Sequence, residues 1–368
     1  MNNSFYIDKN IEVAETLPAT FYTDSNIFSN IKDYIFLKTW HLVGDIKEDL
    51  EIEGTIKPIY LYDGFLNEPL ILVRNYENNY LCLSNVCTHR GNILVNSKSK
   101  LKKISCNYHG RQFDLNGKMI YMPEFNKAKN FPTDKDNLIS FPIEILNDKF
   151  IFISLNPLFS LDSFKKEIQS RLSFLPFNQL ILDSAKSRDY LVKANWALYL
   201  DNYLEGFHIP WVHPDLNKAL DYSSYSTLTF DYFNLQIGIG SSGDYCFNLP
   251  IGHIDYGKQI AAYYYWLFPN LMLNFYPWGL SINIVKPINV NLTKVSYLTY
   301  IYDESKMDIG AGSLLDKVER EDETVVENVQ KGVNSRFYNK GRFSPTMEKG
   351  VHHFHLLLSK FLNLKEKV

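Results

Sequence analysis

The chain has 368 residues, which is too long for one small domain and suits two domains that share an interface. Hydrophobic residues make up 45% and aromatic residues 15% of the chain, so a large core can form and extensive disorder is excluded. The formal net charge of −3 gives no electrostatic basis for binding nucleic acid or an anionic membrane.

The beginning of the chain shows no targeting pattern. Residues 1–15 are polar and acidic without an apolar segment, and the longest apolar run, 260–268, is too short to span a bilayer. We expect residues 1–39 to pack on the second domain. Cys82 and Cys246 lie outside the motif described below and are expected to be free thiols, which favours a cytoplasmic location.

Residues 40–156 are predicted to form an antiparallel, β-rich domain. Short runs of β-forming residues alternate there with turn signals. The strand-like runs are 58–61, 70–73, 81–86 and 149–155.

This β-rich region contains two short segments that each pair a cysteine with a histidine. The candidate ligands are Cys87, His89, Cys106 and His109. A Cys-x-His pair and a Cys-x-x-His pair suit a [2Fe–2S] cluster with two thiolates on one iron and two imidazoles on the other. A structural zinc site needs the same ligand types, but zinc fingers usually keep the two cysteines together and the two histidines together. We therefore favour the iron–sulfur interpretation.

The two segments and the distance between them along the chain resemble the Rieske motif. Gly91 and Gly110 follow the two pairs and suit loops that double back, because glycine tolerates positive backbone angles. Asn107 and Arg111 stand where family members often have proline and tryptophan. The resemblance implies a Rieske [2Fe–2S] domain.

Residues 157–368 mix longer helical patterns with strands, which predicts an α+β domain with an antiparallel sheet and helices on one side. The clearest strands are expected at 270–285 and 294–302. Within the segment 195–214, Asp201, Glu205 and His208 follow the i, i+4, i+7 spacing of one helix face.

His213 lies five residues after His208, about 140° around an ideal helix, so the two could not share a metal on a continuous helix. Pro210 cannot continue the hydrogen-bond ladder and disfavours helical angles at Ile209. We therefore expect a bend there that brings His213 back toward His208.

A third metal ligand is expected from the helical segment 313–332. The apolar stripe of this segment consists of Val318, Val325, Val329 and Val333. Asp322 falls on this stripe, and a carboxylate that points into a core needs a partner or a metal. Glu319 is the main rival, whereas Glu321 and Glu323 lie off the stripe and are interpreted as solvated charges.

His208, His213 and Asp322 would form a facial triad of two histidines and one carboxylate, which leaves positions on Fe(II) open for O2 and substrate. A one-electron cluster would supply the electrons that such an iron needs. From about residue 40 nearly to its end, the chain resembles the α (oxygenase) subunit of Rieske non-haem iron oxygenases. The pattern Asn-Tyr-x-Glu-x-x-His-x4-His at 202–213 looks like their iron motif, and residues 321–332 are similar to their carboxylate helix.

The resemblance also implies how the two metal sites communicate. In the family, an acidic residue three positions before the first iron histidine connects the iron to a Rieske histidine of the neighbouring subunit. Glu205 holds that position here, and its partner would be His109, so we expect a head-to-tail ring, a homotrimer. A glutamate at this position resembles the branch that acts on choline and carnitine. No ferredoxin, flavin or NAD motif is present, which implies a separate flavin or ferredoxin-type reductase.

The substrate is the least determined feature of the sequence. The aromatic residues expected near the iron are Tyr203, Phe207, Trp211, Tyr263, Tyr265, Phe275, Tyr276 and Trp278. Such rings suit a quaternary ammonium compound through cation–π attraction, although plain core packing is the default interpretation. We predict hydroxylation or N-demethylation of a small organic substrate, with a quaternary ammonium compound as first candidate and an aromatic or terpenoid ring as the alternative. A Rieske electron-transfer protein and a zinc-binding protein are the non-enzymatic alternatives.

Overall fold

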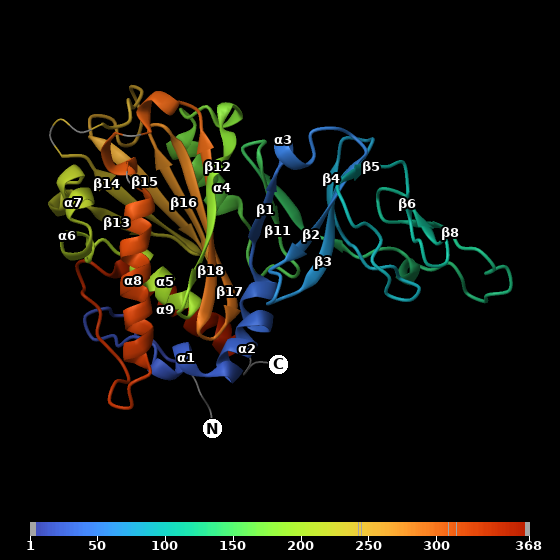
Figure 1. Ribbon diagram of the computed structural model, residues 1–368, viewed down its shortest axis with the longest axis horizontal. Helices are drawn as coiled ribbons and strands as arrows, with labels where there is room; N and C mark the ends of the chain where they lie inside the picture. The colour runs from blue at the N-terminus through green and yellow to red at the C-terminus, as the bar shows by residue number, and fades with distance from the viewer. Residues whose placement is uncertain (1–4, 242, 244, 308, 314, 365–368) are drawn as a thin grey trace. The chain divides into compact units, whose positions relative to one another are not determined.

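The computed structural model describes residues 5–241, 243, 245–307, 309–313 and 315–364 (Figure 1). The chain forms two compact units: a smaller unit of residues 37–161, and a larger unit that combines residues 1–36 with 162–368. Among the described residues, no helix is long and apolar enough to cross a bilayer.

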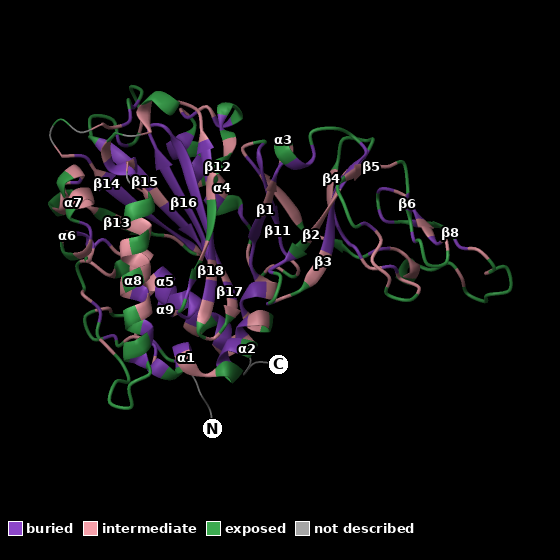
Figure 2. Cartoon of the chain, viewed as in Figure 1, coloured by how far each residue is buried: buried purple, intermediate pink, exposed green. Residues whose placement is uncertain are grey.

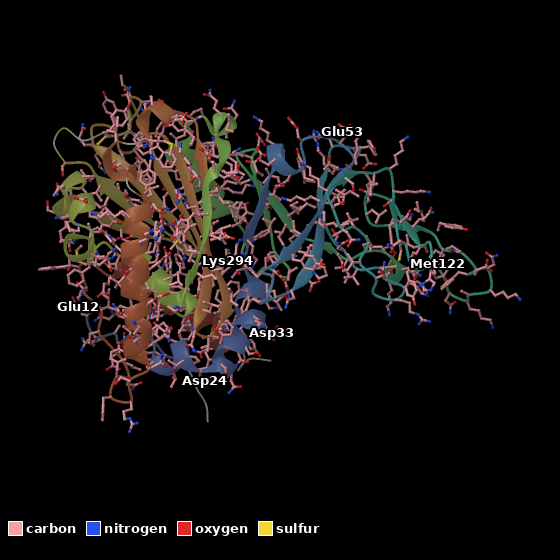
Figure 3. All side chains as sticks on the ribbon, in the orientation of Figure 1. Glu12, Asp24, Asp33, Glu53, Met122 and Lys294 are labelled. Atoms are coloured by element: carbon pink, nitrogen blue, oxygen red, sulfur yellow. The ribbon has the colours of Figure 1, made fainter. Side chains whose placement is uncertain are left out.

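The smaller unit consists mainly of antiparallel sheets, as predicted for this region. Their strand orders are β1-β11-β10, β5-β2-β3-β4-β9 and β6-β7-β8. The elements are β1 (His41–Asp45), α3 (Ile46–Asp49), β2 (Thr55–Leu61), β3 (Glu68–Arg74), β4 (Tyr80–Ser84), β5 (Ser99–Lys100), β6 (Ile104–Ser105), β7 (Gln112–Phe113), β8 (Met119–Tyr121), β9 (Ser140–Phe141), β10 (Ile143–Leu146) and β11 (Phe150–Ile153). Cys87 and Cys106 belong to a hydrophobic core of this unit. Met122, which is labelled in Figure 3, belongs to the same core.

The larger unit is built on an antiparallel sheet of seven described strands in the order β12-β18-β17-β16-β15-β14-β13. The strands are β12 (Ile181–Val192), β13 (Ser226–Thr229), β14 (Phe233–Ile239), β15 (Ile260–Leu267), β16 (Leu271–Tyr276), β17 (Gly279–Asn289) and β18 (Leu292–Ile301). The helices are α1 (Ala19–Thr23), α2 (Ser25–Tyr34), α4 (Asp162–Leu172), α5 (Trp196–Tyr203), α6 (Ile209–Val212), α7 (Pro214–Ala219), α8 (Leu315–Val333) and α9 (Lys349–Leu362). The predicted α+β class is confirmed.

The central strands of this sheet are buried on both faces, which explains their nearly continuous apolar sequences (Figure 2). On β15, Tyr265 contacts Phe164 of α4 with ring centroids 6.2 Å apart, whereas Tyr264 points to the opposite face and lines a cavity. The strand predicted at 270–285 is wrong as a single element, because the chain reverses after Tyr276 and returns as β17.

Helix α8 carries the predicted carboxylate, but its buried stripe is rotated from the predicted one. Val326, Gln330 and Val333 are buried, whereas Val329 is 42% exposed. Gln330 takes an inward position because its Oε1 accepts a hydrogen bond of 2.7 Å from the backbone N–H of Asn195, the residue that caps α5. A count of apolar residues could not detect this polar contact.

Candidate metal centres

The two cluster loops, residues 87–91 and 106–110, have matching backbone structures. In each loop, the backbone N–H of the last residue, a glycine, donates a hydrogen bond of 3.0 Å to the carbonyl oxygen of the first residue, a cysteine. Gly91 has a φ of 71° and Gly110 a φ of 74°, values that favour glycine over other residues. The predicted role of both glycines in doubling the chain back therefore agrees with their conformation.

The four predicted cluster ligands lie at these loops. Cys87 and Cys106 are buried, and the rings of His89 and His109 are 4.8 Å apart between centroids. Burial raises the pKa of Cys87 and would raise that of Cys106, but hydrogen bonds from nearby backbone N–H groups and from the Asn92 amide lower the pKa of Cys106 below its usual value. Donors that converge on a sulfur suit a thiolate bound to iron, so the donor set fits a Rieske cluster.

Arg111 ties the two cluster loops together. Its guanidinium is almost fully buried, and Nη1 donates to Thr88 Oγ1 at 2.7 Å while Nη2 lies 3.3 Å from Asp136 Oδ1. The guanidinium carbon also lies 5.9 and 5.5 Å from the ring centroids of Phe125 and Phe131. A fixed positive charge therefore stands beside the cluster loops.

The segment that carries the two candidate iron histidines differs from the predicted bent helix. Helix α5 ends at Tyr203, and Pro210 lies in the first turn of the short helix α6 (Ile209–Val212) instead of ending a longer helix. Glu205 lies in the turn between them, where its Oε2 accepts a hydrogen bond of 3.1 Å from the backbone N–H of His208. The predicted bend at Pro210 is therefore wrong in position, although the helix is broken.

Asp201 does not share a face with Glu205 and His208. It accepts a hydrogen bond of 2.7 Å from the hydroxyl of Tyr22 and lies 2.9 Å from Nε2 of His355. The prediction of one ionisable face from Asp201 to His208 is wrong, because the helix ends before Glu205 and the turn redirects the later side chains.

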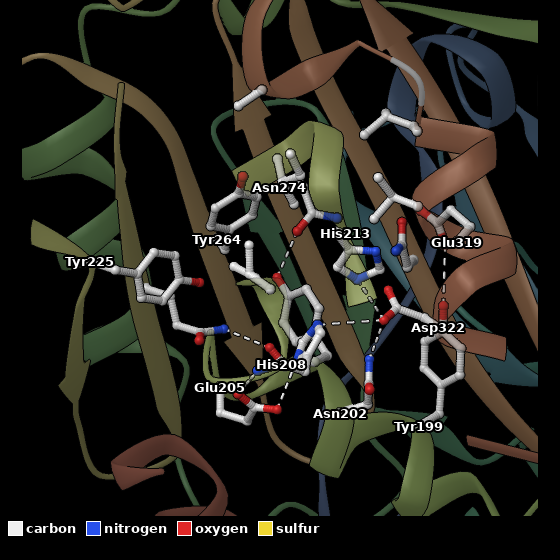
Figure 4. A pocket seen from close by; sticks show the side chains of 18 of the residues that line it. Tyr199, Asn202, Glu205, His208, His213, Tyr225, Tyr264, Asn274, Glu319 and Asp322 are labelled. Atoms are coloured by element: carbon white, nitrogen blue, oxygen red, sulfur yellow. Dashed lines mark hydrogen bonds and ion pairs between the residues drawn. The ribbon is translucent and has the colours of Figure 1, made fainter. Parts of the chain in front are cut away.

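His208, His213 and Asp322 meet at one point of the larger unit (Figure 4). One ligand atom from each lies within 4.8 Å of the others. Asp322 Oδ1 is 2.9 Å from His213 Nε2 and 3.5 Å from His208 Nε2. Glu319, the predicted rival, instead accepts a hydrogen bond of 3.2 Å from Tyr199. Two imidazoles and one carboxylate fit a non-haem Fe(II) site.

A carboxylate supports each histidine from behind. Glu205 Oε1 lies 2.7 Å from His208 Nδ1, and Glu321 Oε2 lies 2.7 Å from His213 Nδ1. These contacts fix both rings and leave Nε2 of each free to face a metal. The interpretation of Glu321 as a solvated charge is wrong, because α8 places its carboxylate against His213, the residue that follows α6.

Asn202 and the local charge complete this site. The Asn202 amide donates to Asp322 Oδ1 at 2.6 Å, a role that only its place in the iron motif could have suggested. Burial would lower the pKa of His213, but its hydrogen bonds with Asp322 and Glu321 raise it above the usual value. The acidic surroundings therefore favour a cation between the ligands.

A cavity of about 90 Å³ adjoins the three ligands. The tyrosines that line it are Tyr199, Tyr203, Tyr225, Tyr264 and Tyr276. Phe207 and Trp211, which were expected near the iron, are 44% and 83% exposed. The expected residues Tyr263, Tyr265 and Phe275 alternate with the lining residues of their strands and face the other side of the sheet, so only part of the aromatic prediction is met.

Comparison with known proteins identifies the family. Residues 39–132 match the Rieske [2Fe-2S] domain, and residues 181–244 and 250–363 match the catalytic domain of the ring-hydroxylating alpha subunit. Choline monooxygenase, chloroplastic, from Arabidopsis thaliana is 30% identical over 379 residues, which cover 96% of this chain and 84% of the relative. The carnitine monooxygenase oxygenase subunit of Escherichia coli (strain K12) is 29% identical over 95% of both chains.

Solved structures share the fold over nearly the whole chain. A quaternary ammonium Rieske monooxygenase matches with a TM-score of 0.76 and 24% identity, covering 97% of this chain and all of that one. Naphthalene 1,2-dioxygenase from Rhodococcus sp. matches with a TM-score of 0.71 and 16% identity, over 96% and 95% of the two chains. The catalytic domain sets aside the non-enzymatic alternatives. The chain belongs to the Rieske oxygenases, as an oxygenase (α) subunit that uses a [2Fe–2S] cluster, a mononuclear iron, O2 and electrons from a reductase partner.

Proposed function

We propose that this chain oxidises a small quaternary ammonium compound at an iron held by His208, His213 and Asp322. The observation that carries the proposal is the convergence of these three residues beside a cavity lined with tyrosines. Electron-rich ring faces attract an alkylammonium ion that cannot form hydrogen bonds. The named activities of the choline and carnitine monooxygenases among its relatives support the same substrate class.

The proposal assigns a task to each group around the metals. Cys87, His89, Cys106 and His109 would hold the [2Fe–2S] cluster. When bound, the cluster supplies single electrons and the mononuclear iron activates O2. Around the iron site, the carboxylates behind the two histidines fix the imidazole rings, and the Asn202 amide orients the third ligand.

Glu205 is proposed to connect the iron site to His109 of a neighbouring subunit. In this chain its Oε2 accepts from two backbone N–H groups of its own turn and its Oε1 lies 2.7 Å from His208 Nδ1, but Oε1 retains a second lone pair. His109 is exposed and thus accessible to a neighbour. A homotrimeric ring would bring the two groups together across an interface.

The remaining partners and the location belong to the same proposal. We infer that a flavin or ferredoxin-type reductase delivers the electrons. We also infer a cytoplasmic location, supported by Cys82, a buried cysteine that forms no disulfide, because a reducing compartment preserves thiols.

O2 uptake with a surrogate reductase would test the proposed function. Choline, carnitine, an aromatic hydrocarbon and a terpenoid would be offered in turn, and the product would be identified and compared with the O2 consumed. We expect coupled product formation from a quaternary ammonium compound and uncoupled or absent turnover with the two ring compounds. Coupled oxidation of a ring compound alone would overturn the proposed substrate class.

A further inference from the structure

Glu319 is a buried acid that the metal site does not use. It lies on α8 three residues before Asp322 and lines the cavity, yet it is not one of the three converging ligands. Its carboxylate accepts hydrogen bonds from the phenols of Tyr199 and Tyr297. Burial raises the pKa of Glu319 to about 8. A carboxylic acid with this pKa is mostly protonated at neutral pH, which relieves the cost of burying a charge, and a cation that binds beside it would favour its ionised form.

The other acids of the cavity are already engaged. Glu205 is paired with His208, and Asp322 contacts both iron histidines. Among the described residues that line the cavity, none is a lysine or an arginine. Glu319 therefore remains as the acid available to a ligand, and the described lining offers no cationic side chain to a ligand's own carboxylate.

Gln236 supplies a second polar group at the cavity, with one atom that has no partner among the described residues. It is 1% exposed and lines the same cavity. Its Nε2 donates to the backbone carbonyl of Tyr203 at 2.8 Å, which fixes the orientation of the amide. Its Oε1 is buried and accepts no hydrogen bond from the part of the chain that the structure describes. A buried acceptor left open beside a cavity suits a donor on the bound molecule.

We propose that the cavity selects a small organic cation that carries a hydroxyl group and no carboxylate, with Glu319 as its counter-charge and Gln236 Oε1 as the acceptor for its hydroxyl. This inference rests on the proposed oxidation of quaternary ammonium compounds and narrows it to cationic alcohols of the choline type. Zwitterions of the carnitine type would bring a carboxylate into a cavity that is already acidic, where like charges repel and lose their hydration.

Binding to the iron-loaded protein without O2 would test the inference, with calorimetry as the measurement. Four ligands would be compared: choline; its neutral isostere, in which carbon replaces the nitrogen; ethyltrimethylammonium, which lacks the hydroxyl group; and carnitine, which adds a carboxylate. We expect choline to bind at least about tenfold more tightly than each of the other three. The neutral isostere lacks the positive charge, ethyltrimethylammonium lacks the hydroxyl group, and carnitine carries a carboxylate that the acidic cavity repels.

The matched variants are Glu319→Gln and Glu323→Gln. Glu323 is a partly buried acid on the same helix whose pKa burial also raises, but it does not line the cavity. We expect Glu319→Gln to lose about tenfold or more in affinity for choline and nothing for the neutral isostere, with iron content unchanged. Glu323→Gln should bind both ligands as the unmodified protein does.

The outcomes separate this inference from the proposed function. Equal affinity for choline and carnitine, or unchanged choline binding by Glu319→Gln, would overturn the role of Glu319 and leave the substrate class standing. Loss of iron in Glu319→Gln would also overturn it, because Glu319 would then serve the metal. Equal affinity for choline and ethyltrimethylammonium would overturn the role of Gln236. Absence of binding by every quaternary ammonium compound would instead overturn the proposed function itself.

Discussion

The cluster loops and the mononuclear iron site use opposite ways of building a metal centre. Each cluster loop closes on itself through backbone hydrogen bonds between residues four or five positions apart. The iron site joins a turn at residues 204–208 and the residue that follows α6 to a carboxylate on α8, more than 100 residues later in the chain. The cluster ligands can therefore be recognised from a short sequence motif, whereas the iron site depends on how elements far apart in the sequence pack together.

The two regions also support their ligands differently. At the cluster loops, backbone N–H groups and one buried guanidinium surround the cysteines. At the iron site, side-chain carboxylates hold the histidines from behind. The first arrangement suits sulfur ligands that carry negative charge, and the second makes neutral imidazoles better ligands for a metal cation. Substitutions should therefore affect each centre separately.

The largest expected effect is the loss of one centre by removal of a single sulfur. Cys87→Ser should lose the visible absorption of the cluster, because serine does not replace a thiolate on this iron. Absorption spectra and iron analysis would measure this. Cys246→Ser, a change of the same kind outside the loops, should keep the colour. A fully coloured Cys87→Ser protein would contradict the assignment of the cluster ligands.

Asp322→Ala should produce the converse result. The colour of the cluster should remain while the mononuclear iron and turnover are lost, since the third ligand is gone. Iron stoichiometry and product formation would be compared with those of Asp316→Ala, which alters an exposed acid of the same helix. Normal iron content and turnover in Asp322→Ala would show that the third ligand is a different residue.

Glu205→Gln should slow electron transfer between the two metal centres without affecting metal binding. The amide oxygen can still accept from His208 Nδ1, so both centres should remain loaded. We expect electrons to pass from the reduced cluster to the iron far more slowly, measured in a single turnover of the reduced protein with substrate and O2. Cluster reoxidation at the unmodified rate would mean that Glu205 only stabilises its turn.

Glu321→Ala should weaken iron binding without removing the site. The loss of a carboxylate behind a metal-bound histidine typically lowers affinity by about 10- to 100-fold. Competition with a chelator would measure the dissociation constant, with Glu323→Ala, two residues further along α8, as the control. Equal iron affinities in the two variants would show that the contact between Glu321 and His213 does not support iron binding.

The smallest effect is expected at Arg111. Arg111→Gln removes a buried positive charge beside the cluster loops and should lower the reduction potential by an amount on the order of tens of millivolts. A redox titration followed by electron paramagnetic resonance would measure the shift. Arg90→Gln changes the net charge equally at an exposed loop position and should leave the potential nearly unchanged. Equal shifts in both variants would rule out a specific role for Arg111.

The sequence by itself determined the β-rich region, the candidate ligands of both centres and the antiparallel sheet of the larger unit. It could do so because cysteine and histidine spacing and strand alternation are local properties that neighbouring residues display. Asp322 stood out for the same reason, as a carboxylate on an apolar helix stripe, even though the predicted stripe includes the exposed Val329.

Only the tertiary structure decided where α5 ends, which acids support the histidines and which tyrosines reach the cavity. Glu321 and Gln330 face inward because partners far along the chain, His213 and the backbone of Asn195, satisfy their polar groups. The same packing gives Asp322 and Glu319 different partners. The two iron histidines lie against Asp322, whereas two phenols donate hydrogen bonds to Glu319. Spacing along a helix cannot reveal such partners, since burial of a polar side chain depends on the element packed against it.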